Sequence, residues 1–335
     1  MKILVIRFSS LADIVLATPI VRILKTQLDE VVVHFATELQ YKNIMENNPY
    51  IDTIYYLDKN LATLMKELKI EKYDCVIDLQ NSFDTRIIKW KLGVASYSIP
   101  NLRLEKWLMV KLKINKLSSR HQMDLYLETL QSLNVKNDAL GLDYFIPEKD
   151  EVPLEWIPET HRNGYVAFAI DAQYNTKKLP VQRLIELCDK INKPVILLGD
   201  TEDFEIGEAV RIFFDRSKQT DGYEEGLNKL GKDTIIFNSC GLFNLNQSAS
   251  LVKQANYVFA YETGLMQIAA AFRKEVFSLW GNTIPAFGFY PYRTKFTVLE
   301  NSNLSCRPCS STGYNKCPKG HFKCMNEIVF DFYVK

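Results

Sequence analysis

Short aliphatic runs, separated by polar or amphipathic segments, recur along the whole chain. Uninterrupted apolar runs of this kind are typical of strands that are buried on both faces of a parallel sheet. In the first half, the predicted strands cover residues 3–8, 31–37, 53–57 and 75–79. In the second half, they cover residues 165–170, 194–199, 234–237, 257–261 and 276–281.

The segments between these runs carry the spacing of amphipathic helices. Thr18 followed by Pro19 is typical of a helix start, so we expect a helix from about Pro19 to Gln27. Residues 10–13 would then form a short exposed loop after the first strand. Helices are also predicted at 180–191 and 246–255. This alternation predicts an α/β fold with parallel sheets that carry helices on both faces.

Residues 147–163 interrupt the alternation with three prolines and five acidic residues. We interpret them as a linker, because a chain of 335 residues favours two domains over one. The predicted domains are residues 1–155 and 156–335, facing each other across a cleft. The polar stretch from Arg216 to Asp233 is predicted to be a surface loop.

Composition adds few constraints. The 47% hydrophobic and 24% charged residues are ordinary for a soluble globular protein, and the net charge of +1 predicts no particular partner. No apolar run is long enough to span a membrane, and the first residues enter a strand without a leader, so we expect a cytoplasmic protein. Cys75, Cys188 and Cys240 lie singly in apolar segments and are interpreted as reduced core residues.

Asp13 is the first candidate for chemistry, because ligands of open α/β sheets bind outside the carboxyl ends of the strands. A carboxylate there can act as a general base on an attacking hydroxyl. Aspartate is also favoured at helix caps, so Asp13 could instead cap the turn before Pro19.

Glu262, Thr263 and Gly264 follow a predicted strand and open a helix. The free N–H groups of a helix start bind phosphate, although the same residues could be a simple cap. One lysine of the run 175–178 could neutralise a diphosphate leaving group, or could be a solvated loop charge. Glu202, beyond another strand, could accept hydrogen bonds from ribose hydroxyls.

The chain has neither the glycine fingerprint of dinucleotide-binding folds after its first strand nor a P-loop motif. These absences count against a nicotinamide oxidoreductase and against a P-loop enzyme. A base at one wall of a cleft and an anion site at the other favour group transfer from a phosphate-activated donor.

Residues 86–120 hold nine Lys or Arg and one acidic residue, with Trp90 and Trp107 between them. A basic face with aromatic side chains fits an anionic membrane surface or a phosphorylated acceptor. No motif supports nucleic acid as the partner. A solvated helix face is the alternative.

Four cysteines near the C-terminus have partial zinc-site spacing, with His321 close by. The alternative is a set of reduced cysteines that serve only in packing. These cysteines are Cys306, Cys309, Cys317 and Cys324.

Five segments together resemble glycosyltransferase family 9, the ADP-heptose:lipopolysaccharide heptosyltransferases, most of all the versions found in Bacteroidetes-type bacteria. They occur in the family's order, and the resemblance covers nearly the whole chain. The segments are RFSSLADIVLATPIVRILK from Arg7, NTKKLPVQRLIELC from Asn175, ETGLMQIAAAF from Glu262, WGNTIPAFGFYPY from Trp280 and the cysteine-containing tail from Cys306.

The resemblance implies a GT-B fold, in which a Rossmann-like first domain binds the acceptor and a second binds the nucleotide sugar. It implies an inverting, metal-independent and cofactor-free transfer of heptose from ADP-heptose to the lipopolysaccharide inner core. From the basic and aromatic residues 86–120, we expect peripheral contact with the inner face of the inner membrane. Asp13 falls on the catalytic base, and Lys178 on the lysine that contacts the donor phosphates. The other predicted substrate-binding residues are Ser9, Ser10, Thr176, Glu202, Glu262, Thr263, Gly264 and Gln267.

Three positions depart from the family pattern: Ala12, Glu262 and Gln267 stand where the family usually has Gly, Asp and His. Glutamine keeps hydrogen bonding but cannot carry a positive charge beside a diphosphate. Two alternatives therefore accompany the heptosyltransferase reading. One is a transferase with a different nucleotide-sugar donor, and the other is a nucleotide-binding protein that has lost catalysis.

Overall fold

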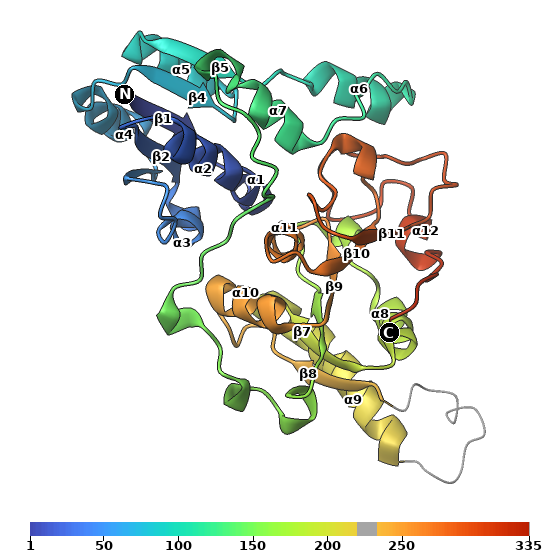
Figure 1. Cartoon of the computed structure of the whole chain (residues 1–335). Coiled ribbons are helices and arrows are strands. Elements are labelled where there is room, and N and C mark those ends of the chain that lie inside the picture. The colour runs from blue at the N-terminus through green and yellow to red at the C-terminus, as the bar shows by residue number, and fades with distance from the viewer. Residues whose placement is uncertain (220–232, 335) are drawn as a thin grey trace.

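The computed structural model describes residues 1–219 and 233–334, and it contains two parallel β-sheets flanked by helices (Figure 1). The first sheet has the strand order β3-β2-β1-β4-β5. Its strands are β1 (Lys2–Ile6), β2 (Val32–Glu38), β3 (Thr53–Leu57), β4 (Cys75–Asp78) and β5 (Ala95–Ser98).

The second sheet has the order β11-β10-β9-β6-β7-β8, again with all neighbours parallel. In both sheets the first strand of the half lies inside the sheet, and the order reverses beside it, as in doubly wound folds. The strands are β6 (Val166–Ala169), β7 (Pro194–Leu198), β8 (Ile235–Asn238), β9 (Tyr257–Tyr261), β10 (Glu275–Trp280) and β11 (Phe296–Glu300).

The predicted α/β architecture is thus confirmed, but the sequence did not predict β5 and β11. Both are edge strands with one neighbour each. Strand β5 reads Ala-Ser-Tyr-Ser and is largely exposed, so it lacks the apolar run that marks the buried strands. Strand β11 mixes polar with apolar residues, as expected for an edge.

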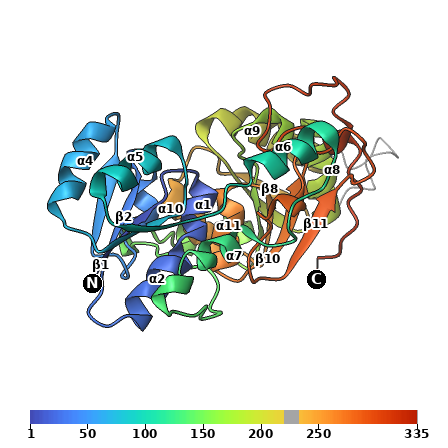
Figure 2. The same ribbon diagram turned by 90° about the horizontal axis from the view of Figure 1, so that it is seen from above.

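Helices cover both sheets (Figures 1 and 2). Those of the first half are α1 (Leu11–Leu16), α2 (Thr18–Gln27), α3 (Lys42–Met45), α4 (Leu61–Ile70), α5 (Phe83–Leu92), α6 (Arg103–Leu112) and α7 (Gln122–Glu128). Those of the second half are α8 (Val181–Ile191), α9 (Phe204–Gln219), α10 (Leu245–Gln254), α11 (Gly264–Ala271) and α12 (Lys323–Asn326). None of the helices in the described ranges is long and apolar enough to cross a membrane.

The predicted exposed loop at residues 10–13 was wrong, because helix α1 starts at Leu11. Two interactions favour this helix. The Ser10 hydroxyl donates to the Asp13 carboxylate across the first turn, at 2.9 Å. The apolar residues Ile14 to Leu16 then bury completely against the sheet. Helix α2 follows after Ala17 and contains Thr18, which is therefore not its cap.

The predicted linker, residues 147–163, contains three short 3-10 turns. The turns are Glu148–Asp150, Leu154–Trp156 and Glu159–His161. The loop predicted from Arg216 to Asp233 was wrong at its start, because α9 continues to Gln219. Residues 220–232 of that prediction lie outside the described residues.

The largest apolar cluster contains side chains from both halves, such as Ile14 of α1 and Ile268 of α11. Helices α1 and α11 pack so closely that a Cβ added to Gly264 would lie 1.6 Å from Leu11 Cδ2. Glycine at this position therefore allows the contact between the two halves.

Candidate functional site

Two cavities lie where the strand order of each sheet reverses, the place at which α/β folds bind ligands. The first, of about 160 Å³, is lined by residues that follow β1 and β4, including Arg7, Asp13 and Asn81. The second, of about 530 Å³, is lined by residues that follow β6 and β9, including Asp171 and Thr263. Each cavity also takes residues from the opposite half, so both lie between the halves.

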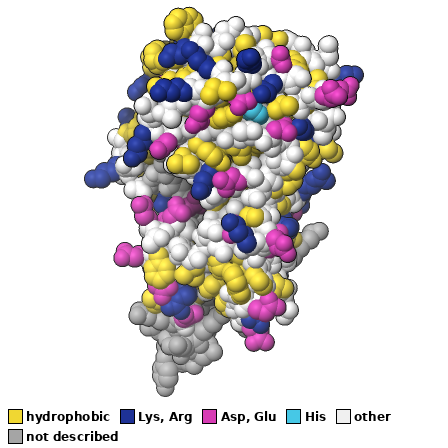
Figure 3. Space-filling model, turned by 90° about the vertical axis from the view of Figure 1, so that its left-hand side faces the viewer, with side chains coloured by type: hydrophobic (Ala, Val, Ile, Leu, Met, Phe, Trp, Pro, Cys, Tyr) yellow, Lys and Arg dark blue, Asp and Glu magenta, His cyan; other side chains and the backbone are white. Residues whose placement is uncertain are grey.

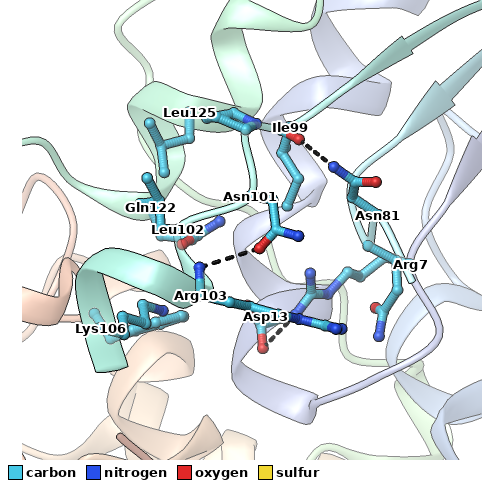
Figure 4. A pocket seen from close by; sticks show the side chains of 13 residues that line it. Arg7, Asp13, Asn81, Ile99, Asn101, Leu102, Arg103, Lys106, Gln122 and Leu125 are labelled. Carbon is cyan, nitrogen blue, oxygen red and sulfur yellow. Dashed lines mark hydrogen bonds and ion pairs between the residues drawn. The ribbon is translucent and has the colours of Figure 1, made fainter. Parts of the chain in front are cut away.

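Asp13 lies at the first cavity beside Arg7 (Figure 4), and three side chains hold its carboxylate. The Tyr126 hydroxyl donates to Oδ1 at 3.0 Å. Arg7 Nη2 lies 2.7 Å from Oδ2, and the Ser10 hydroxyl donates to the same oxygen at 2.9 Å. Only 7% of Asp13 is exposed. These contacts fix the orientation of the carboxylate while one edge still reaches the cavity.

Arg7 and Tyr126 hold Asp13 in the candidate site, and the sequence analysis missed both. Burial alone would lower the pKa of the Arg7 guanidinium. The nearby Asp13, with smaller contributions from Tyr126 and Asp78, more than offsets burial and raises this pKa. A signal for Arg7 existed, because a charged residue directly follows the aliphatic strand. No local signal existed for Tyr126, which reaches Asp13 from α7, 113 positions along the chain.

Helix α6 supplies a basic wall to the first cavity through Arg103 and Lys106 (Figure 4). The ammonium of Lys106 lies 5.1 Å from the centre of the Phe289 ring, which belongs to the second half. Burial lowers the pKa of Lys106, although Asp13 and Glu262 oppose this shift. With Arg7, the wall offers three cations around Asp13 and suits an anionic ligand.

The second cavity surrounds the start of α11. It is lined by Glu262, Thr263 and Gly264 and, from α1 and the residue before it, by Ser10, Leu11 and Ala12. The Thr263 hydroxyl is buried and has no hydrogen-bond partner. An unpartnered hydroxyl next to the free N–H groups of a helix start is suited to an anion.

Both lysines of the 175–178 run line the second cavity, and each is paired. Lys177 Nζ lies 2.9 Å from Glu262 Oε2, at the start of α11. Lys178 Nζ lies 2.6 Å from Asp203 Oδ1, in the 3-10 turn that follows β7. The Thr283 hydroxyl also donates to Glu262 Oε2, at 2.6 Å. Lys177 is therefore the lysine paired at the start of α11, whereas the sequence analysis selected Lys178.

Asp171 follows β6 and is a further residue of this cavity that the sequence analysis missed. Burial, with the neighbouring Asp200 and Asp203, raises its pKa to about 7. Its Oδ1 atom is buried and has no hydrogen-bond partner. Asp171 can therefore change its protonation state near neutral pH.

Most of the predicted substrate-binding residues come together at the second cavity. Ser10, Lys178, Glu202, Glu262, Thr263 and Gly264 all line it. Ser9 lines neither cavity described above, although it lies beside Ser10 in the chain.

Thr176 and Gln267 are placed differently from the prediction, and both are buried. The Thr176 hydroxyl donates to the Tyr314 carbonyl at 2.9 Å and accepts from the Tyr314 N–H at 2.8 Å, which fixes the C-terminal tail. Gln267 Nε2 donates to the Phe289 carbonyl at 2.8 Å. In this structure both side chains hold neighbouring chain segments instead of lining a cavity.

The four tail cysteines do not form a metal centre in the structure. Within residues 1–219 and 233–334, no group of three or more His, Cys, Asp or Glu is arranged to hold a metal ion. Cys306 Sγ lies 3.8 Å from His321 Nε2. Cys324 is buried in the second half's core, and burial raises its pKa to about 12. The geometry therefore gives the zinc hypothesis no support.

A family model described as glycosyltransferase family 9 (heptosyltransferase) matches residues 61–318. Lipopolysaccharide heptosyltransferase 1 of Campylobacter coli is 20% identical over 308 residues, which cover 84% of each chain.

Solved structures are similar over most of the chain. A family 9 glycosyltransferase from Veillonella parvula has a TM-score of 0.70 and 21% identity, covering 90% of this chain and 86% of that one. The E. coli ADP-heptose lipopolysaccharide heptosyltransferase II has a TM-score of 0.67 and 16% identity, covering 98% of both chains. The fold is therefore the GT-B fold implied by the sequence resemblance.

Proposed function

Because the chain belongs to glycosyltransferase family 9, we propose that it transfers a heptose from ADP-heptose to the core of a lipopolysaccharide. The names of its relatives support this donor and this acceptor. A structure of the E. coli heptosyltransferase WaaC with ADP-2-deoxy-2-fluoro heptose aligns with 93% of this chain, at a TM-score of 0.63 and 16% identity.

One observation carries the proposal: the segment from Ser10 to Asp13 belongs to both cavities. Ser10, Leu11 and Ala12 line the second cavity, and Asp13 lines the first. A carboxylate is therefore presented a few residues from a site suited to a phosphate. This proximity is what a transfer between a bound donor and a bound acceptor needs.

In the proposed reaction, the donor diphosphate binds at the start of α11, against Thr263, Gly264 and Lys177. The diphosphate competes with Glu262 for the ammonium of Lys177, since these two side chains are paired at 2.9 Å. The helix start and the lysine stabilise the charge that develops on the leaving group, so the residues present can support its departure without a metal. Glu202 is the candidate acceptor for ribose hydroxyl hydrogens.

The acceptor occupies the first cavity, and Asp13 removes the proton from its attacking hydroxyl. The oxygen attacks the sugar carbon as the bond to the diphosphate breaks, on the opposite side of that carbon. A single displacement of this kind inverts the configuration at the carbon. Arg7 and Tyr126 keep the carboxylate in position throughout.

The test incubates the purified chain with ADP-heptose and a heptose-deficient lipopolysaccharide core. We expect ADP release together with a heptose added to the acceptor. Calorimetry with ADP, UDP and GDP is the companion measurement, and we expect ADP to bind most tightly. Preference for UDP or GDP would favour another donor, and tight nucleotide binding without any product would favour the non-catalytic alternative.

A further inference from the structure

Helices α5 and α6 expose large apolar side chains together with basic ones. Phe83 and Trp90 are 76% and 81% exposed, and Trp107 is 50% exposed. Such exposure of aromatic residues is unusual for a surface that faces only water. We define the α5–α6 surface by Phe83, Trp90, Lys91, Leu104, Trp107 and Lys111.

The spacing of these residues makes one stripe on each helix. On α5, Phe83 and Trp90 are seven positions apart, so they lie on the same side of the helix. On α6, Leu104, Trp107 and Lys111 are three and four positions apart, and all three are exposed. No residue of α6 is buried, although it is an amphipathic helix.

The inner side of α6 is already occupied by the second half of the molecule. Lys106 lies against the Phe289 ring at 5.1 Å, and Lys113 donates to the Cys306 carbonyl at 3.0 Å. These contacts fix the helix in place and leave its outer stripe in solvent. The stripe is therefore exposed even though α6 is packed against the second half of the molecule.

The two helices that carry these stripes lie at the same end of the molecule. Helices α5 and α6 both lie at the top of Figure 1, and both face the viewer in Figure 2, which looks down on that end. Figure 3, a side view, shows hydrophobic side chains next to Lys and Arg at this upper end.

The charges of this surface are mostly positive. Arg86, Lys91, Arg103 and Lys111 are exposed on the two helices, with Asp84 as the exposed acid. Neither Lys91 nor Lys111 forms an ion pair within the part of the chain that the structure describes. Exposed tryptophans among unpaired lysines match the interface of a bilayer with anionic head groups.

We propose that the α5–α6 surface docks on an anionic phospholipid bilayer. Trp90 and Trp107 enter the head-group region, and Lys91 and Lys111 contact lipid phosphates. The first cavity opens between the starts of these helices, since Asn81 precedes α5 and Asn101 precedes α6. If the proposed transfer is correct, this docking brings a lipid-anchored acceptor to the cavity that holds Asp13.

The test is co-sedimentation of the full chain with vesicles, without donor or acceptor. We expect binding to mixed phosphatidylcholine–phosphatidylglycerol vesicles and little binding to phosphatidylcholine alone. Lys91→Glu with Lys111→Glu should weaken binding at least about tenfold, because each basic residue near an anionic surface contributes on the order of 1 kcal/mol. Trp90→Ala with Trp107→Ala should weaken it similarly and remove the blue shift of tryptophan emission.

Matched controls lie away from this surface. Trp156→Ala removes another exposed tryptophan, from the 147–163 segment, and Lys253→Glu reverses the charge of a lysine on α10. Both should leave vesicle binding unchanged. Equal loss in the controls, equal binding to neutral vesicles, or binding of RNA without binding of vesicles would each overturn the proposal.

The outcome is separable from the transferase proposal. Asp13→Asn should bind vesicles like the wild type, because Asp13 is buried in the first cavity and does not belong to the α5–α6 surface. A chain that transfers heptose but ignores vesicles would overturn only the docking proposal.

Discussion

The connection from β1 to α1 and the connection from β9 to α11, here called the first and the second corner, have the same topology but different chemistry. Each joins a central parallel strand to a short helix, and each carries an acid near the corner. Asp13 is tied to Arg7 and Tyr126 of its own half. Glu262 is tied to Lys177, and its neighbour Thr263 keeps a free hydroxyl. One topology thus supplies a fixed carboxylate at one corner and an open anion site at the other.

The largest expected effects, and the strongest test of this comparison, come from neutralising Asp13 and Glu262 one at a time. Asp13→Asn should lower kcat at least about a hundredfold, because a general base contributes about 10²–10⁴ to the rate. ADP affinity should stay the same, since Asp13 lines the other cavity. Glu262→Gln should instead alter ADP affinity, because it releases Lys177. Steady-state kinetics and ADP calorimetry measure both, and an unchanged kcat in Asp13→Asn would remove that residue from the mechanism.

The second prediction separates the two lysines of the anion site. Lys177→Met should weaken ADP binding about tenfold or more, because a charge-assisted hydrogen bond contributes about 1.5–3 kcal/mol. Lys178→Met is the matched control and should weaken it less, since Lys178 is paired with the buried Asp203 and not with the acid at α11. Calorimetric titration with ADP decides between them. The reverse order would restore the role that the sequence resemblance gave to Lys178.

The third prediction concerns the place where the two corners touch. Gly264→Ala adds a methyl group 1.6 Å from Leu11 Cδ2, so it should lower the free energy of unfolding by about 1–3 kcal/mol. In a Leu11→Ala background the same change should be neutral or stabilising, because alanine favours the helix. Urea denaturation of the four proteins in this cycle measures the coupling. Additive effects would contradict the contact.

The last prediction is a pH dependence that belongs to the second cavity, which Asp171 lines from the end of β6. The pKa of Asp171 is raised to about 7 in the folded chain, from 3.8. Between these values the folded state binds more protons than the unfolded state, so stability from this group falls as the pH rises from about 4 to about 7. At pH values above this window, Asp171→Asn should therefore raise Tm. At pH values below it, the substitution should change Tm little. Thermal unfolding across pH tests it, and parallel curves for both proteins would contradict it.

The sequence predicted those parts of the site that depend on neighbours in the chain. Asp13 follows an aliphatic strand, and Thr263 and Gly264 open a helix after another, so local patterns were sufficient. Tyr126 reaches Asp13 from α7, and Lys106 reaches the first cavity from α6, and only tertiary packing brings them there.

The remaining differences have the same physical origin. Thr176 and Gln267 look like binding residues because of their position in a motif. In the structure the Thr176 hydroxyl bonds Tyr314, and Gln267 Nε2 bonds the Phe289 carbonyl while its buried Oε1 has no partner. The choice between Lys177 and Lys178 depends on which way two adjacent side chains project. Their partners, Glu262 and Asp203, lie far away in the sequence.

The short helix α1 has one further consequence. Its residues divide between the cavities by their direction around the helix axis, with Leu11 and Ala12 on one side and Asp13 on the other. Each residue of a helix is rotated by about 100° from the one before it. Inserting or deleting a single residue between Ser10 and Asp13 would therefore turn the carboxylate away from the first cavity while the strand and the helix both persist. In this chain, the length of this turn must therefore stay constant for the proposed transfer to take place.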